Sequence, residues 1–285
     1  MSASRSVVLT GAAGGLGSAT VRRLAGSGWR VFATDLAGPA LDALAGDGVT
    51  TIACDVTDES SVAAMTEAVR SQADRLDAVV NFAGILGVGP LVEIAAADFR
   101  RVLDVNVVGG FLVNRALFPL LHRAAIDGGS GSGGRPRIVL LSSETGWQSA
   151  MPFNGPYAIS KHAVEAYGDS LRRELAILGI AVVKIQPGAF KTGMVESILG
   201  RFGALADAST NYERVLRLAQ KRIPQEERRA GNPADLAALV ERVLEAPRPK
   251  PAYRIHTNPQ AAALDRLPTR VVDRLLLTAF RRANR

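Results

Sequence analysis

The chain has 285 residues, 47% of them hydrophobic, and a net charge of +7 at neutral pH. This apolar content is enough for one large core and excludes an intrinsically disordered chain. A single cysteine excludes an internal disulfide, and the three histidines are too scattered along the sequence for a metal site. The basic residues are interleaved with acids and lack an aromatic stacking platform, which argues against nucleic-acid binding.

Seven short apolar runs predict β-strands, and segments of helical periodicity separate them. The expected strands are Arg5–Thr10, Arg30–Asp35, Thr50–Cys54, Asp77–Asn81, Arg137–Leu141, Ile180–Gln186 and Ala252–His256. The expected helices are Ser18–Ser27, Asp58–Ala73, Asp98–Ala124, Tyr157–Leu178 and Pro233–Glu245. Apolar strands that alternate with helices imply a parallel sheet with helices on both faces. We therefore predict an α/β fold: one doubly wound, Rossmann-like domain over residues 1–285, with a mostly parallel sheet of about seven strands.

Two segments follow a looser pattern. Residues 189–230 are mixed in character and are interpreted as a substrate-binding lid, and residues 258–285 as a C-terminal helical extension. The extension carries one broad apolar face, with arginines elsewhere. This pattern favours packing on the core or on another subunit, and peripheral contact with a membrane surface is the alternative.

The chain shows no sign of export or of a membrane span. The apolar run before the first glycine, Val7–Leu9, has only three residues, too few for the hydrophobic part of a secretory signal. The most lipid-like stretch, Val102–Leu121, contains Asp104 and Arg115, and such charges are costly in a bilayer. We therefore predict a cytoplasmic protein without a transmembrane segment.

A glycine-rich turn joins the first predicted strand to the first predicted helix. Glycines let the backbone approach a pyrophosphate, and the N-terminus of a helix favours negative charge. An ordinary tight turn is the alternative, because a glycine-rich turn alone is weak evidence. Its position between strand and helix favours a dinucleotide site, with cofactor contacts at Thr10, Gly11, Gly14, Gly15, Leu16 and Gly17.

Asp35 ends the second predicted strand, in the place where dinucleotide sites carry an acid. Its carboxylate would accept hydrogen bonds from the adenosine ribose hydroxyls and would repel a 2′-phosphate. Gly14 and Leu36 provide no basic side chain to receive such a phosphate. We therefore predict NAD as the cofactor, in preference to NADP.

Tyr157 and Lys161 lie four residues apart at the start of a predicted helix, so they share one face of it. A phenol is a poor base at neutral pH, and a nearby ammonium favours the phenolate and lowers the phenol pKa. A surface tyrosine beside an unrelated lysine is the alternative. Only five of the 34 basic residues are lysines, which makes a chance lysine at this spacing less frequent.

Ser142 and Ser143 follow the fifth predicted strand, at the sheet edge where open parallel sheets bind their ligands. A hydroxyl there can donate a hydrogen bond to a substrate oxygen, whereas a turn or helix cap is the usual role of such a serine. We assign the catalytic role to Ser143 and a structural role to Ser142, and the choice between them stays open.

Together these residues resemble the short-chain dehydrogenase/reductase family, from about Val7 to Thr192. Ser143, Tyr157 and Lys161 match its catalytic positions, and the resemblance implies Asn106 as the fourth. It also implies cofactor contacts at Asp55, Val56, Asn81, Ala83, Gly84, Tyr157, Lys161, Pro187, Gly188 and Thr192.

Two features depart from the family pattern. Phe82 replaces a residue that is commonly a second asparagine or another small side chain, and Ser143 precedes Tyr157 by one residue more than usual. The second departure bears on the choice of the catalytic serine.

The resemblance implies hydride transfer between NAD(H) and an alcohol or ketone, with Tyr157 as the acid-base and Asn106 holding a water that links Lys161 to solvent. The stretch Pro152–Asn154 just before Tyr157 and the extended C-terminal tail are similar to the steroid- and retinoid-type branch of the family, so we expect a lipophilic secondary alcohol or ketone. The residues expected to contact this substrate are Trp147, Met151, Phe153, Met194 and Ile198.

Two further expectations concern the state of the protein. Family members are commonly homodimers or homotetramers, and the helices Asp98–Ala124 and Tyr157–Leu178 would form the contacts between subunits. The rival functional hypothesis is a non-catalytic NAD-binding regulatory or scaffold protein of the same fold, because a fold alone does not guarantee chemistry.

Overall fold

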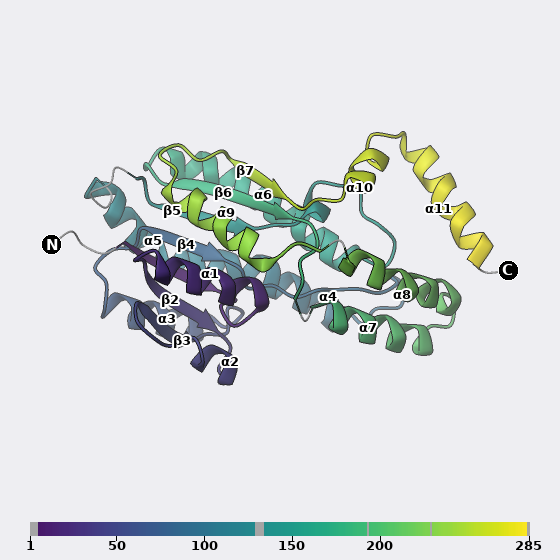
Figure 1. Ribbon diagram of the computed structural model, residues 1–285, viewed down its shortest axis with the longest axis horizontal. Coiled ribbons are helices and arrows are strands. Elements are labelled where there is room, and N and C mark those ends of the chain that lie inside the picture. Colours follow the sequence, from purple (N-terminus) through teal and green to yellow (C-terminus); the bar gives the residue numbers. More distant parts are fainter. Residues whose placement is uncertain (1–4, 129–133, 193, 229, 284–285) are drawn as a thin grey trace.

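The computed structural model describes residues 5–128, 134–192, 194–228 and 230–283 (Figure 1). Seven strands form one sheet in the order β3-β2-β1-β4-β5-β6-β7, and every neighbouring pair is parallel. The strands are β1 Ser6–Thr10, β2 Arg30–Asp35, β3 Val49–Ala53, β4 Ala78–Asn81, β5 Arg137–Leu141, β6 Ala181–Pro187 and β7 Ala252–Ile255. The predicted strands and the Rossmann-like fold are therefore confirmed.

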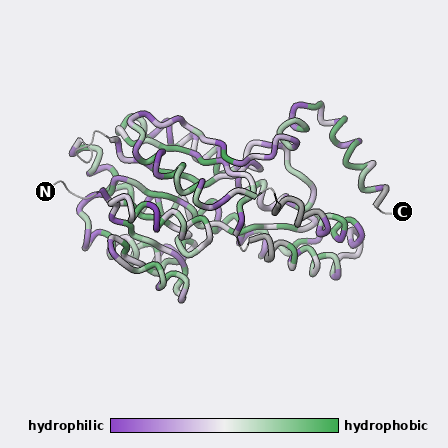
Figure 2. The backbone as a smooth tube through the Cα atoms, in the orientation of Figure 1, coloured by the Kyte–Doolittle hydropathy of each residue, from purple (hydrophilic) through white to green (hydrophobic). Residues whose placement is uncertain are grey.

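Helices cover both faces of this sheet (Figure 1). On one face lie α1 Gly15–Gly26 and α9 Pro233–Glu245, and on the other α3 Glu59–Arg70, α5 Gly109–Ile126 and α6 Gly155–Ala176. Side chains alternate between the faces along each strand, so Val7 and Leu9 join the core under α1 and α9, while Val8 joins the opposite core. Figure 2 shows the resulting hydrophobic stretches through the central strands.

The strand order reverses between β1 and β4, because β2 and β3 lie on one side of β1 and the later strands on the other. Such a reversal leaves a crevice at the carboxyl ends of the strands, where this class of sheet binds its ligands. The residues that follow β1, β4 and β5 therefore meet at one place.

The long helix expected at Asp98–Ala124 is divided. Helix α4, Ala96–Leu103, passes into a π-helical turn, η1 Asp104–Val108, before α5 begins. By length and composition the whole stretch Ala96–Ile126 could cross a membrane, but Leu117 and Leu121 of α5 are fully buried against the sheet. One side of α5 therefore packs in the domain core, and 39% of the most apolar 18-residue window of the stretch is buried.

The lid segment is more regular than its sequence suggests. It contains α7 Met194–Ala208 and α8 Glu213–Arg228, which pack on each other beyond the carboxyl ends of the strands (Figure 1). The C-terminal extension forms α10 Pro259–Leu264 and α11 Thr269–Ala283, and α11 projects from the body of the domain. The remaining short elements are α2 Pro39–Asp42 and the 3-10 turn η2 Glu144–Gly146.

Candidate active site

The glycine-rich turn after β1 requires glycine at two positions. Gly11 has a φ of +68°, and a Cβ atom there would lie 2.6 Å from the backbone of Phe82 and Ala83. A Cβ atom on Gly17 would lie 2.0 Å from the Gly11 carbonyl oxygen. The turn is thus pressed against the chain after β4 on one side and against the first turn of α1 on the other.

The N-terminus of α1 is open to an anion. Gly14 and Gly15 are exposed, and no side chain of the described residues caps the first turn of the helix. The first N–H groups of a helix have no partner within it, and the helix dipole adds partial positive charge there. This end of α1 therefore has the chemistry of a phosphate-binding site.

Asp35 lies beside this turn at the end of β2. One carboxylate oxygen accepts a hydrogen bond from the Ala13 N–H and the other from the Leu36 N–H, both at 2.8 Å. The negative charge is therefore fixed next to the glycine-rich turn. Asp55 instead accepts hydrogen bonds from the amide and hydroxyl of Thr57, at 2.9 and 2.7 Å.

The segment after β6 reaches the same place. Gly188 donates its N–H to the Ile255 carbonyl, and a Cβ atom on it would lie 2.0 Å from the His256 carbonyl oxygen. Four residues later, Thr192 stands within 2.9 Å of where a Cβ atom on Gly15 would be. The fold thus brings Thr192 to the glycine-rich turn.

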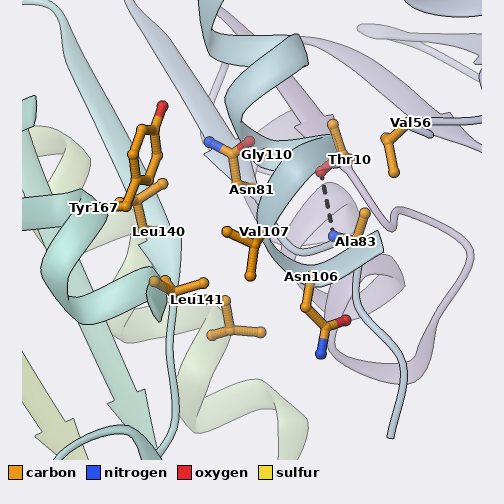
Figure 3. A pocket seen from close by; sticks show the side chains of 11 residues that line it. Thr10, Val56, Asn81, Ala83, Asn106, Val107, Gly110, Leu140, Leu141 and Tyr167 are labelled. Atoms are coloured by element: carbon orange, nitrogen blue, oxygen red, sulfur yellow. Dashed lines mark hydrogen bonds between the residues drawn. The ribbon is translucent and has the colours of Figure 1, made fainter. Parts of the chain in front are cut away.

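A small cavity of about 20 Å³ lies below the crevice (Figure 3). Thr10 closes one side, where its hydroxyl accepts hydrogen bonds from the Phe82 and Ala83 amides at 3.2 Å. Asn81 donates to Asn114, and its own Oδ1 is buried without a partner among the described residues. The cavity has room for about one water molecule, which is too little for a substrate. Val56, Asn106 and Val107 also line it.

Asn106 lies in the π-helical turn η1 and is almost fully buried. Its side-chain oxygen accepts the Ile85 N–H at 2.7 Å, and its amide donates to the Ile85 carbonyl and the Ser160 hydroxyl, both at 2.9 Å. A π-helical turn displaces the backbone locally and is often found at functional sites. The contact with Ser160 joins this turn to α6 beside Lys161.

Tyr157 belongs to the first turn of α6, and its phenol is hydrogen-bonded to the Ser143 hydroxyl. Ser143 also caps η2 by accepting the Thr145 N–H at 3.2 Å. The neighbouring Ser142 hydroxyl is buried and has no partner within the described chain. Of the two candidate serines, Ser143 is therefore the one in contact with the phenol.

Lys161 follows Tyr157 by one helical turn, and only 4% of its surface is exposed. Its Nζ atom donates to the Leu141 carbonyl at 2.8 Å and lies 5.5 Å from the centroid of the Tyr157 ring. Gly84 also borders this ammonium, since a Cβ atom there would lie 3.8 Å from Nζ. The tyrosine, the serine and the lysine thus meet beyond the end of β5.

Burial controls both titrating groups. It raises the pKa of Tyr157 to about 12, against the effect of the hydrogen bond with Ser143 and together with that of the Glu144 carboxylate. It lowers the pKa of Lys161 to about 8, against the effect of the Glu165 carboxylate. The pKa of Tyr157 in the protein alone is therefore raised by burial, not lowered towards neutral pH as expected. The Lys161 ammonium is hydrogen-bonded to the Leu141 carbonyl.

Of the expected substrate contacts, Trp147 follows η2, and Phe153 precedes α6 with a φ of +67°. Phe153 contacts the rings of Tyr212 and Phe280, with centroids 5.6 and 6.2 Å away. Met151 is 44% exposed at the rim. The side chains of the other two expected contacts lie outside the described part of the chain, and both belong to α7: Met194 and Ile198.

A family model described as short chain dehydrogenase matches residues 5–200. The chain belongs to the short-chain dehydrogenase/reductase family. Proteins of this family bind a nicotinamide cofactor, NAD or NADP, and oxidise or reduce CH–OH groups. The glycine-rich turn, the open end of α1 and the crevice beyond β1 and β4 fit such a dinucleotide.

Several of its curated relatives carry the names of retinol and steroid dehydrogenases. The chain is 39% identical over 214 residues to retinol dehydrogenase 16 of Homo sapiens, covering 72% of this chain and 63% of that protein. It is 37% identical over 194 residues to human 17-beta-hydroxysteroid dehydrogenase type 6, covering 66% and 57%. These matches span less than two thirds of the relatives' own length.

Among solved structures, a single-residue variant of actinorhodin polyketide ketoreductase with NADPH has a TM-score of 0.73 at 27% identity. The superposition covers 88% of this chain and 95% of the ketoreductase. The dehydrogenase fold is therefore shared over almost the whole of that enzyme.

Sequence reasoning did not identify two groups that act on Lys161. The contact with the Leu141 carbonyl could not be predicted, because every residue has the same backbone acceptor. The contact with Glu165 could have been predicted, because Glu165 follows Lys161 by four residues and so lies one turn along the same face of α6.

With Tyr157 as the proton acceptor, we expect alcohol oxidation by this protein to depend steeply on pH. Between pH 6 and 7 the phenolate fraction rises while Lys161 keeps its proton, so kcat/KM should rise by about tenfold over that unit and more slowly towards pH 8. Above pH 8 the rise should flatten as Lys161 loses its charge. A pH–rate profile of alcohol oxidation tests this, and a flat profile from pH 6 to 8 would contradict it.

Proposed function

We propose that the protein is an NAD-dependent oxidoreductase that interconverts a lipophilic secondary alcohol and its ketone. The observation that carries the proposal is the meeting of Tyr157, Ser143 and Lys161 beyond β5. There the Lys161 Nζ atom lies 5.5 Å from the centroid of the Tyr157 ring and 2.8 Å from the Leu141 carbonyl oxygen. The neutral phenol of Tyr157 and the neighbouring Ser143 hydroxyl can both donate hydrogen bonds to the same substrate oxygen. A bound nicotinamide supplies or accepts the hydride.

In ketone reduction, Tyr157 donates its proton to the carbonyl oxygen while Ser143 donates a hydrogen bond to the same oxygen. Alcohol oxidation runs in reverse, with the phenolate of Tyr157 taking the hydroxyl proton. Lys161 stabilises that phenolate with its positive charge. Asn106 joins the chain at Ile85 to α6 beside Lys161, through hydrogen bonds with Ile85 and Ser160. The water that is expected to link Lys161 to solvent stays a prediction.

Two observations support a lipophilic substrate. The curated relatives carry retinol and steroid dehydrogenase names, and the residues around the lid form an apolar cluster. In this cluster Val88, Phe202 and Leu216 are buried, with Phe153 and Leu205 packed against them. Apolar walls favour ligands of the same character and exclude water from the reacting oxygen.

The preference for NAD rests on Asp35. Its carboxylate stands beside the glycine-rich turn, held by the Ala13 amide. A 2′-phosphate there would meet this negative charge, whereas ribose hydroxyls can donate hydrogen bonds to it.

Replacing Asp35 by Asn should therefore relax the cofactor preference. Asn keeps an oxygen for the Ala13 amide and removes the negative charge. We expect the ratio of kcat/KM for NAD to that for NADP to fall by about tenfold or more. The matched control is Asp42→Asn, which removes an exposed acid from α2. An unchanged ratio in Asp35→Asn would show that this carboxylate does not select the cofactor.

Replacing Tyr157 by Phe should abolish most turnover while the cofactor still binds. The variant lacks the proton donor, and general acid-base groups contribute about 10²- to 10⁴-fold in rate. Tyr167→Phe is the matched control, because it removes a hydroxyl from the same helix, where Tyr167 is hydrogen-bonded to Asn114. The measurements are kcat over a panel of alcohols and ketones, and NAD affinity by titration.

Near-normal turnover in Tyr157→Phe would disprove the role of the phenol. Tight NAD binding by the unmodified protein without turnover of any panel member would instead favour the non-catalytic NAD-binding hypothesis. The predicted homodimer or homotetramer and the predicted cytoplasmic location stay predictions.

A second proposal concerns contact of α11 with an anionic membrane surface, which would bring a lipophilic substrate close to the site. Phe280 packs against Phe153, but Val271, Leu275 and Leu277 are about half exposed. Arg274 lies on the polar side of the same helix. An amphipathic helix with basic and exposed apolar side chains is suited to the headgroup boundary of such a membrane.

The double variant Arg270→Glu/Arg274→Glu tests this contact by sedimentation with vesicles. We expect the protein to sediment with vesicles of phosphatidylcholine and phosphatidylserine, and the double variant to bind them about tenfold more weakly. The control Arg100→Glu/Arg101→Glu reverses two exposed arginines of α4 and should bind normally. Equal binding by both double variants would rule out α11 as the attachment site.

A further inference from the structure

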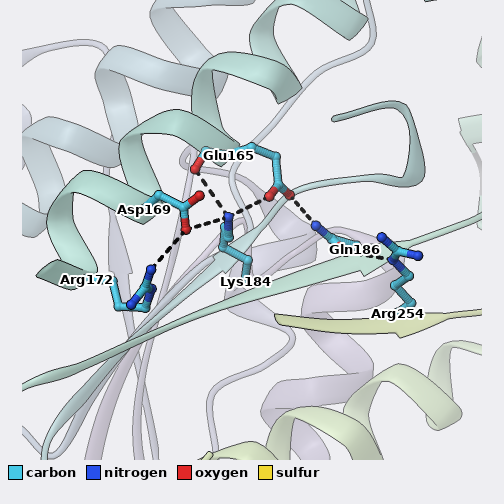
Figure 4. Close-up of polar contacts among 6 residues, drawn as sticks. All are labelled: Glu165, Asp169, Arg172, Lys184, Gln186 and Arg254. Carbon is cyan, nitrogen blue, oxygen red and sulfur yellow. Dashed lines mark hydrogen bonds and ion pairs between the residues drawn. The ribbon is translucent and has the colours of Figure 1, made fainter. Parts of the chain in front are cut away.

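A buried ion-pair cluster lies between α6 and the end of the sheet, next to the catalytic helix face (Figure 4). Lys184 of β6 has a side chain only 8% exposed, and its Nζ atom lies 2.8 Å from Glu165 Oε2 and 2.9 Å from Asp169 Oδ1. Gly168 leaves room for it, since a Cβ atom there would lie 2.9 Å from Lys184 Cδ. A buried ammonium needs such partners, so Lys184 fixes the carboxylate of Glu165 in one position.

The second carboxylate oxygen of Glu165 starts a chain of contacts. It accepts a hydrogen bond from Gln186 Nε2 at 2.9 Å, and Gln186 is itself only 5% exposed. The oxygen of Gln186 accepts from Arg254 Nε at 3.3 Å (Figure 4). The Arg254 guanidinium carbon then lies 3.7 Å from the centroid of the Trp147 ring, a stacking distance.

The same helix also holds the segment between Ser143 and Trp147 directly. A Cβ atom on Gly146 would lie 2.9 Å from the Lys161 carbonyl oxygen and 3.2 Å from Glu165 Cγ. The segment is therefore in contact with α6 at its middle and with Arg254 at its end. Neither contact uses the groups that take part in the proton transfer.

We propose that Glu165 and Arg254 are positioning residues that hold Trp147 as one wall of the substrate pocket. Arg254 stacks on the ring, and Gln186 and Glu165 hold Arg254 in a fixed relation to the catalytic helix. The inference rests on the proposed function in one respect, that Trp147 contacts the substrate. It adds that β7, at the far edge of the sheet, contributes to substrate selection.

The geometry has a consequence for specificity. A Trp147 ring held in one orientation favours a large, flat, apolar substrate, because the substrate loses its contact area with the ring when the ring can rotate away. A small secondary alcohol does not reach that wall and does not depend on it. Loosening Trp147 should therefore weaken the binding of bulky substrates and leave small ones unaffected.

The first experiment follows Trp147 itself. The chain has two tryptophans, so in a Trp29→Phe background the fluorescence reports Trp147 alone. In this background Arg254→Leu should increase acrylamide quenching and shift the emission, because the ring loses its cover. The matched control Arg248→Leu removes an exposed arginine six positions earlier and should change neither.

The second experiment measures kinetics with a bulky cyclic alcohol and with a small secondary alcohol. We expect Arg254→Leu and Gln186→Leu to raise KM for the bulky alcohol by about three- to tenfold, with kcat and KM for NAD unchanged. Arg254→Lys keeps the charge but not the planar stack, so it should behave like Arg254→Leu. A merely structural role would lower kcat for both alcohols alike.

Glu165 is tested without leaving an unpaired charge. The variant Glu165→Leu/Lys184→Met removes both the Glu165 acceptor and its ammonium partner, while Asp169 keeps Arg172 at 3.6 Å. It should fold where Glu165→Leu alone leaves Lys184 short of a partner. It should loosen Trp147 as Arg254→Leu does, whereas Lys184→Leu/Asp169→Asn, which keeps Glu165, should do so less.

Unchanged quenching and unchanged KM in both Arg254→Leu and Gln186→Leu would overturn the proposal. If Arg254→Leu changes the quenching of Trp147 but the unmodified protein turns over no substrate, the proposed function is wrong and the positioning of Trp147 still holds. Changed quenching with equal KM effects on both alcohols would show that Trp147 is not a substrate wall.

Discussion

The arrangement of the site depends on the burial of the Lys161 ammonium. Its hydrogen bond to the Leu141 carbonyl joins α6 to the end of β5. Because Ser143 follows Leu141 by two residues and Tyr157 precedes Lys161 by one turn, this single contact brings the serine and the tyrosine together. The charge is costly to bury, so the surrounding backbone must supply an acceptor and the helix must keep its position.

Burial also determines whether the Tyr157 phenol is protonated at neutral pH. A phenol with a pKa near 12 is protonated at neutral pH and is ready to donate, which suits ketone reduction. Alcohol oxidation requires the phenolate, and the positive charge of Lys161 is the group of this chain that favours it. Burial lowers the pKa of Lys161, and the Glu165 carboxylate one turn further along α6 counteracts this loss of charge.

Glu165 connects the two halves of the site. On the catalytic side it faces Lys161, and on the other it begins the hydrogen-bonded chain through Gln186 to Arg254 and Trp147. In the functions proposed above, acid-base chemistry and substrate selection share the Glu165 carboxylate, which is held in place by Lys184. The same proposals give the edge strand β7, which carries Arg254, a role in the active site.

The sequence by itself determined the parallel α/β fold, because strands that are apolar on both faces have to be covered by helices. It also located the glycine-rich turn and the Tyr157–Lys161 pair, since their chemistry depends on residue type and short spacing. Three features were decided only by the tertiary structure: the π-helical turn that holds Asn106, the contact of Ser143 with Tyr157, and the raised phenol pKa. Each depends on burial and on contacts between residues distant in sequence, which no local pattern records.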